Sequence, residues 1–271
     1  LPALYGFMDE GYLNIGKMKN YGVEASISWK AIQTNDWFWT IDYNVTWNRN
    51  KITDLSGVSE GGKPVPTGDR IDISNRVLAH QVGYAANSFW VFQQAYDENG
   101  KPLENVVVDR DGDGQITSAD KYLYKNIMAP VTMGLSTRLE YKNWDLGASF
   151  RASLDNYVYN SIQQGQRLTA PNALFYQDSY LANRIVGTLG WQSDSDASKL
   201  TDYFVQNASF LKCDNITLGY SFDKLFHNDA WNGLAGRVYA TCSNVFTITN
   251  YEGIDPEVSS GIDGGIYPRP I

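Results

Sequence analysis

The 271-residue sequence predicts an all-β chain of antiparallel strands, and three observations support this fold class. The first is a strict alternation of apolar and polar residues, because a period of two is typical of a strand with one apolar face. The alternating stretches lie near 20–49, 131–154 and 209–247. The second is a short connection that divides each stretch into the two strands of a hairpin. The third is a high aromatic content of 14%, with 8 Trp and 18 Tyr, which favours β structure.

The first hairpin shows the alternation most clearly. Its apolar positions are Tyr21, Val23, Ala25, Ile27 and Trp29, and then Trp37, Trp39, Ile41, Tyr43, Val45 and Trp47. Apart from Gly22 and Phe38, polar residues stand between the apolar positions within each strand, and the short break from Gln33 to Asp36 separates the strands. A Trp-rich face opposite a polar face suits a half-buried sheet in a soluble sandwich. It equally suits a transmembrane barrel, whose strands are apolar towards lipid and polar towards the lumen.

The second and third stretches repeat this arrangement. Strands are predicted from Val131 to Tyr141 and from Trp144 to Arg151, joined by a two-residue turn at Lys142 and Asn143. The third stretch alternates at Ile216, Leu218, Tyr220 and Phe222, and again at Val238, Ala240 and Cys242.

The two cysteines, Cys213 and Cys242, fall on neighbouring predicted strands but on opposite faces by their parity. We therefore expect them to be unpaired, because a disulfide needs both Cβ atoms close together and aimed at each other.

The connections between the predicted strands alternate in length. Short ones lie within the hairpins, and long segments without a sustained period lie near 50–130, 155–207 and 248–266. Outer-membrane barrels have this alternation of tight turns and long external loops, with aromatic girdles at the membrane interfaces. A soluble domain rarely carries such long structureless loops, and six open strands would leave two unpaired edges. These points favour the barrel over the soluble sandwich.

Composition excludes several classes of function. The net charge is −8, from 22 basic and 30 acidic residues, which argues against nucleic acid as a partner. The sequence contains no run of about 18 apolar residues, so it predicts no transmembrane helix. His80 and His227 are its only histidines, and no catalytic motif stands out. We therefore do not expect an enzyme.

Ordered motifs are spread along the whole chain. They are Asn20–Glu24, Val82-Gly83 with Phe89-Trp90, Asp109–Asp120, Pro130 with Gly134, Phe210–Lys212, Asn215–Tyr220, Arg237–Tyr239, Asn244–Thr247, Tyr251–Glu257 and Tyr267-Pro268. This set resembles the C-terminal part of the SusC/RagA-type TonB-dependent outer-membrane transporters of Bacteroidetes. The chain stops at Ile271, whereas the last strand of that family would end in an aromatic residue.

The resemblance implies that residues 1–271 are the C-terminal section of a 22-stranded antiparallel transmembrane β-barrel with long extracellular loops, within a longer protein. It implies an importer of oligosaccharides or peptides in the outer membrane of a Gram-negative, Bacteroidetes-type bacterium. The implied partners are a SusD-type surface lipoprotein, TonB acting through an upstream plug region, and the outer-membrane lipid. Two alternatives stay open: a passive porin or barrel adhesin, and a secreted soluble glycan-binding or glycan-cleaving β domain.

An acidic segment from Asp109 to Asp120 matches the spacing of an EF-hand calcium loop. The predicted oxygen ligands are Asp109, Asp111, Asp113, the backbone carbonyl of Gln115, and Asp120 in place of the usual Glu. Ile116 is expected to anchor the loop on apolar neighbours. We expect a structural calcium ion, because four crowded carboxylates would repel one another without a cation. The alternative is an acidic turn held by Asx hydrogen bonds.

Aromatic residues in the long segments are candidate contacts for a substrate or a partner protein. The candidates are Phe89, Trp90, Phe92, Tyr96, Phe175, Tyr176 and Trp191. Exposed rings can stack on sugars or anchor a partner. The alternative is that these rings pack within the loops.

Overall fold

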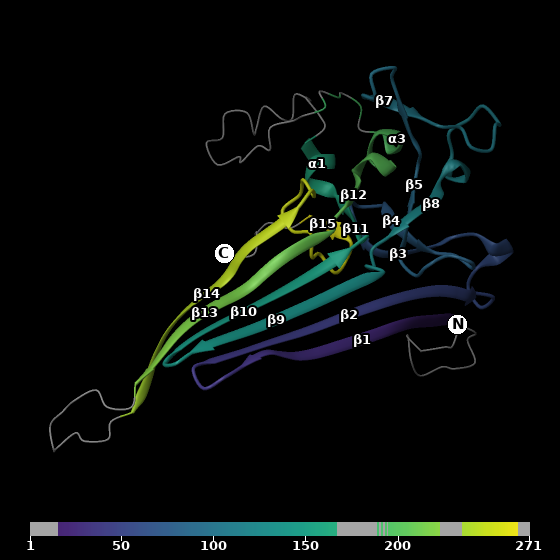
Figure 1. The fold of residues 1–271 in the computed structure, drawn as a ribbon. Coiled ribbons are helices and arrows are strands. Elements are labelled where there is room, and N and C mark those ends of the chain that lie inside the picture. The colour runs from purple at the N-terminus through teal and green to yellow at the C-terminus, as the bar shows by residue number, and fades with distance from the viewer. Residues whose placement is uncertain are drawn as a thin grey trace, which may run out of the picture.

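The computed structural model describes residues 16–166, 189, 191, 193, 195–222 and 235–264. Its main element is a six-stranded antiparallel sheet in the order β1-β2-β9-β10-β13-β14. The strands are β1 (Lys17–Gln33), β2 (Trp37–Asp54), β9 (Val131–Tyr141), β10 (Trp144–Leu154), β13 (Phe210–Phe222) and β14 (Gly236–Thr249). They run side by side from a cluster of smaller elements to the short turns at the far end (Figure 1). The predicted antiparallel strand pairs are confirmed.

The sheet has one apolar and one polar face across all six strands. Residues paired across antiparallel strands point to the same side, so the register defines each face. One row of paired residues consists of Trp29, Ile41, Thr137, Ala148, Ile216 and Cys242. The adjacent row consists of Ser28, Asp42, Ser136, Ser149, Asn215 and Ser243. We call the sides that these two rows occupy the apolar face and the polar face.

Large side chains of the apolar face are open to the surroundings. Val23 is 66% exposed, Ile27 64% and Trp29 58%. The hydroxyl of Thr137, in the middle of this face, is satisfied within the sheet: it accepts from Trp39 Nε1 at 2.8 Å and donates to the carbonyl of Thr40 at 3.1 Å. A contiguous apolar surface of this extent requires a covering phase or partner.

Aromatic pairs flank the short turns at the far end of the sheet. The ring centroids of Trp37 and Tyr141 are 4.2 Å apart, and those of Trp144 and Tyr220 are 4.8 Å apart. Between them Lys142 adopts a positive φ of 52°, which gives the predicted two-residue turn its tight reversal. The gathering of rings at one level across four strands is typical of an interfacial girdle.

A β-bulge corrects the predicted facing of the cysteines. Asp214 is an extra residue in β13, because Ser149 pairs with Asn215 whereas Phe150 pairs with Cys213. The shift returns Cys213 to the apolar face, the same side as Cys242. The prediction that the two cysteines face opposite sides is therefore wrong, because an extra residue reverses the parity beyond it. Both cysteines are free.

The long connections contain regular structure of their own. The first carries η1 (Glu60–Gly62), β3 (Val65–Arg70), β4 (Arg76–His80), β5 (Ser88–Val91), β6 (Gln94–Tyr96), β7 (Pro102–Val107), η2 (Ser118–Asp120) and β8 (Tyr122–Asn126). The later ones carry β11 (Tyr157–Asn160), α1 (Ser161–Gln166), α3 (Asp196–Lys199), η4 (Asp202–Phe204), β12 (Val205–Asn207) and β15 (Ile262–Asp263). Within the described residues, neither helix has the length or apolar character to cross a membrane.

These small elements lie at the end of the sheet opposite the short turns (Figure 1) and share a hydrophobic core, which we call the loop core. The core combines residues of the first connection, such as Val77, Leu78 and Phe89, with Tyr159 and Phe204 of the second. The expectation of structureless loops is therefore wrong. Its physical reason is that the strands here are short and pair across distant segments, so no sustained period marks them in the sequence.

Candidate calcium loop and the loop end of the sheet

The acidic loop between β7 and η2 is shaped by its own carboxylates. Asp109 Oδ1 accepts from the backbone N–H of Gly112 at 2.7 Å, and its Oδ2 accepts from that of Gly114 at 2.9 Å. Both glycines have positive φ, 75° and 81°, which L side chains rarely adopt. The backbone path therefore favours glycine at both positions.

Asp120 closes the loop from its far end. Its side chain is fully buried, and Oδ1 accepts from the N–H of Arg110 at 2.8 Å while Oδ2 accepts from that of Thr117 at 2.8 Å. Thr117 caps η2 in return, through a bond from Ala119 N at 3.1 Å to its hydroxyl. The backbone bond from Thr117 contributes most to lowering the pKa of Asp120, so this carboxyl is ionised at neutral pH.

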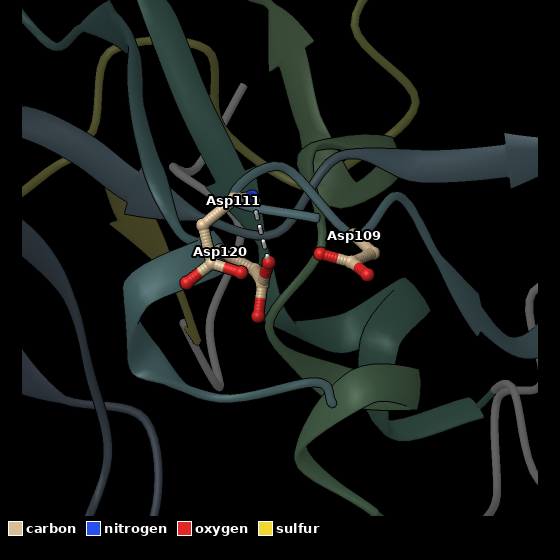
Figure 2. A group of neighbouring side chains, drawn as sticks. All are labelled: Asp109, Asp111 and Asp120. Carbon is tan, nitrogen blue, oxygen red and sulfur yellow. Dashed lines mark hydrogen bonds between the residues drawn. The ribbon is translucent and has the colours of Figure 1, made fainter. Parts of the chain in front are cut away.

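Three of the predicted ligands come together. Carboxylate oxygens of Asp109, Asp111 and Asp120 all lie within 4.8 Å of one another, and Figure 2 shows the three side chains around one point of the loop. Asp113 lies outside this group, and its Oδ1 accepts from the N–H of Gln115 at 2.7 Å. Gln115 is exposed.

Charge crowding at this point is visible in the pKa of Asp111. A hydrogen bond from the backbone of Asp113 lowers it, but desolvation and the negative charges of Asp113, Asp120 and Asp109 together raise it above its ordinary value. Hard cations such as Ca²⁺ prefer carboxylate and carbonyl oxygens, and a cation would relieve this repulsion. The residues present therefore fit a calcium ion, although they also satisfy the Asx hydrogen bonds of the alternative reading.

The candidate calcium loop is attached to the hydrophobic core of the connections by Arg110, and not by Ile116. The Arg110 guanidinium lies over the ring of Tyr122, 4.5 Å from its centroid, and donates to Gln93 Oε1 at 2.7 Å. Ile116 is 45% exposed, so the prediction that it anchors the loop is wrong. Tyr122 continues the attachment, because its hydroxyl donates to Asp202 Oδ2 of the second connection at 2.6 Å.

The predicted aromatic contacts divide into three groups. Phe89 (0% exposed), Phe92 (4%) and Trp191 (3%) fill the loop core, so they are not a contact surface, because apolar rings gain most by leaving water. Trp90 is half-buried beneath Lys121, whose Nζ lies 4.9 Å from its ring centroid, whereas Tyr96 is 49% exposed. Phe175 and Tyr176 lie outside the described residues.

A partly buried charge cluster at the loop end of the polar face was not predicted. Arg151 Nε lies 2.9 Å from both oxygens of Asp214, and Arg151 also pairs with Glu257. Lys212 Nζ donates to Glu257 Oε2 at 3.0 Å, and both of these side chains are less than 10% exposed. The alternation placed Arg151 on the polar face, but the bulge that presents Asp214 leaves no signal in the sequence.

The chain is similar to known proteins over its whole length. No family model matches the chain. Over its whole length it is 49% identical to the TonB-dependent receptor SusC of Bacteroides thetaiotaomicron, of which it covers 27%. It is 26% identical over 94% of its length to the TonB-dependent receptor P3 of Formosa agariphila, of which it covers 28%. The chain thus spans about a quarter of the length of these curated relatives.

Solved structures give the same result for the fold. The chain matches the RagAB peptide importer in its "closed-closed" state with a TM-score of 0.69 and 26% identity, and in its "open-open" state with 0.71 and 25%. Each match covers 97% of the chain and 29% or 28% of the other protein. The chain is a segment of a SusC/RagA-type TonB-dependent receptor. It therefore belongs to the outer membrane of a Bacteroidetes-type bacterium.

In this receptor segment the sequence motif from Tyr251 to Glu257 has a structural role. Glu257 binds Arg151 and Lys212, whereas the hydroxyl of Tyr251 donates to Asp263 Oδ2 at 2.9 Å. Burial raises the pKa of Tyr251, and the charge of Asp263 raises it further, so the phenol stays protonated as the donor. The contacts of Glu257 fasten the connection after β14 to the loop end of the sheet, whereas the bond between Tyr251 and Asp263 joins two parts of that connection.

Proposed function

We propose that the receptor containing this segment is an active importer, and that the six strands are the C-terminal section of a closed 22-stranded barrel. The observation that carries this proposal is the apolar face that continues across all six strands. Such a face suits lipid, with the polar face lining a lumen. The SusC relative and the RagAB neighbours support the receptor class. The chain's residues would supply wall and loops, without bond-making chemistry.

The proposed cargo is an oligosaccharide or a peptide, taken up together with a SusD-type surface lipoprotein. One structural neighbour is described as a peptide importer, which supports the peptide class. The free energy for transport would come from TonB acting on a plug region elsewhere in the receptor. The packed loop core stands at the end of the wall opposite the short turns, where a lipoprotein partner would meet a rigid surface.

Uptake measurements distinguish an importer from the alternatives. Cells are supplied with labelled oligosaccharides and peptides, with and without the intact receptor gene, and with and without a protonophore. We expect receptor-dependent uptake of one cargo class that falls to background when the protonophore removes the energy source. Uptake that persists would identify a passive porin, and attachment without uptake an adhesin. Recovery of the native protein in the soluble fraction without detergent would overturn the proposal.

We further propose that calcium binds at Asp109, Asp111 and Asp120 and stiffens the first connection. The support is the convergence of three carboxylates on one point and the raised pKa of Asp111. The backbone carbonyl of Gln115 and the carboxylate of Asp113 stay candidate ligands of the same loop. When bound, calcium would neutralise the crowded charge, so its role would be structural.

Removing calcium is expected to expose this loop to proteases. Full-length receptor is digested with a protease in calcium or in EDTA, and cleavage between residues 108 and 121 is followed by mass spectrometry. We expect several-fold faster cleavage in EDTA, and calcium should restore the slow rate. In the variant Asp111→Asn the rate should no longer depend on calcium, whereas Asp97→Asn, in the turn between β6 and β7, should retain the dependence. Equal cleavage with and without calcium in the unchanged protein would contradict the assignment.

A further inference from the structure

A group of cations interrupts the apolar face at its loop end. Along β1 and β2 the apolar face continues from Trp29 towards the loop end. There Val23 pairs with Trp47, Tyr21 with Arg49, and Lys19 with Lys51. At the paired positions of the described strands from Met18 onward, Lys19, Arg49 and Lys51 are the charged residues on this face. All three carry the same sign. We call them the cation triad.

The cation triad begins immediately beyond an aromatic boundary. The rings of Tyr21 and Trp47 meet edge to face, with centroids 5.9 Å apart. The part of β2 from Trp37, beside the short turn, to Trp47 is long enough to cross the hydrocarbon, for which a tilted strand needs roughly 9–11 residues. Arg49 lies two residues further along β2, or roughly 7 Å at the rise of an extended chain. The cation triad therefore stands at the depth of lipid headgroups.

The three cations are available for an external ligand. Lys19, Arg49 and Lys51 are exposed, and among the described residues none of them forms an ion pair. The nearby ion pair joins Lys17 to Asp54 at 3.8 Å. Three like charges without an ion-pair partner among the described residues repel one another, so an anion is the ligand that this surface favours.

A cavity adjoins the cation triad and supplies further contacts. It has a volume of about 340 Å³, and its lining includes Tyr21, Arg49, Lys51, Tyr84 and Tyr124. Tyr84 is held beside β2 by the backbone, because Ile52 N donates to its carbonyl at 2.8 Å. Two cations with three phenol rings suit a phosphorylated sugar, since guanidinium and ammonium groups bind phosphate and rings pack on sugar faces.

From these observations we infer that Lys19, Arg49 and Lys51 bind the phosphate-bearing headgroup of lipid A in the outer leaflet. The inference rests on the proposed membrane orientation, in which the short turns face the periplasm and the loop core faces outward. The cations replace the metal ions that otherwise bridge neighbouring lipid phosphates. One anionic lipid would then be held against β1 and β2 at the foot of the loop core.

Lipid binding by the purified full-length receptor tests this inference. The probes are lipid A, dephosphorylated lipid A and inorganic phosphate, each titrated against receptor in detergent at fixed ionic strength. The test variant is Lys19→Gln/Arg49→Gln/Lys51→Gln. The control is Lys30→Gln/Lys142→Gln, which removes charge at the short-turn end. We expect lipid A affinity to fall by roughly fivefold per charge removed, on the order of 100-fold in all. The control and the swap Arg49→Lys/Lys51→Arg should bind nearly as the unchanged receptor does.

Outcomes separate this inference from the proposed function. Barrel insertion is scored independently by heat-modifiable migration of outer-membrane fractions. If the unchanged receptor is not inserted, the proposed function fails. If the inserted triple variant binds lipid A as tightly as the unchanged receptor, or if dephosphorylated lipid A binds equally well, only the headgroup site fails. The headgroup site would also be overturned if inorganic phosphate bound as tightly as lipid A. The same holds if the triple variant lost a lipoprotein partner while it still bound lipid A.

Discussion

Ile27→Arg is expected to reduce the stability of the inserted barrel by about 2–4 kcal/mol, the cost of a cation facing lipid near the bilayer midplane. Ile27 is 64% exposed on the apolar face and pairs with Tyr43, midway between the aromatic boundaries at Trp37 and Trp47. A charged group at this depth must be desolvated or drag water into the hydrocarbon. The measurement is urea unfolding of receptor in lipid vesicles, together with the assembled fraction in outer membranes.

The neighbouring position on β1 is the matched control for that change. Ser26 pairs with Asn44 on the polar face, so Ser26→Arg places the same cation towards the lumen. We expect it to assemble normally and to change stability by less than about 1 kcal/mol. Equal losses in both variants would show that the two faces have been assigned wrongly.

Glu257→Gln is expected to cost about 3–5 kcal/mol, because it leaves the buried ammonium of Lys212 without its counter-charge. Glu257 and Lys212 have side chains that are 8% and 7% exposed, and Arg151 approaches the same carboxylate. The variant should also loosen the connection after β14, so protease cleavage between residues 250 and 264 should accelerate. Unfolding and cleavage are measured on the same full-length preparation.

A solvated pair provides the comparison for this cluster. Arg138 and Glu140 lie 2.8 Å apart with side chains 59% and 38% exposed, so Glu140→Gln should cost no more than about 1 kcal/mol. Adding Lys212→Met to Glu257→Gln should recover part of the loss, because it removes the cation that Glu257→Gln leaves unpaired. If Glu257→Gln costs no more than Glu140→Gln, the cluster does not fasten the connection.

The faces of the long strands could be predicted from the sequence because alternation is a local property. From Tyr21 to Lys30 and from Trp37 to Arg49 the first hairpin follows its expected alternation, and so does Val131 to Tyr141, although a register shift between Lys30 and Ile32 interrupts it beside the turn. The parity failed at Asp214, where one extra residue reverses the facing of Cys213. A bulge depends on the register of the strand beside it, and that register is set by residues far away in the chain.

The convergence of three carboxylates could be predicted from the sequence, whereas calcium binding there stays a prediction. Spacing alone indicated Asp109, Asp111 and Asp120, because the ligands of such a loop are close in sequence. The aromatic contacts depended on burial instead. Phe89, Phe92 and Trp191 could not be told from exposed rings, because the segments that cover them come from distant connections.

By itself the sequence determined the antiparallel strands, their apolar and polar faces, the short turn at Lys142 and the acidic loop, since each rests on residues within one hairpin or one loop. Only the tertiary structure decided which aromatic rings are buried, how Glu257 meets Arg151 and Lys212, and where the cation triad stands relative to Trp47. These depend on strand register and on contacts between segments far apart in the chain, which local patterns do not encode.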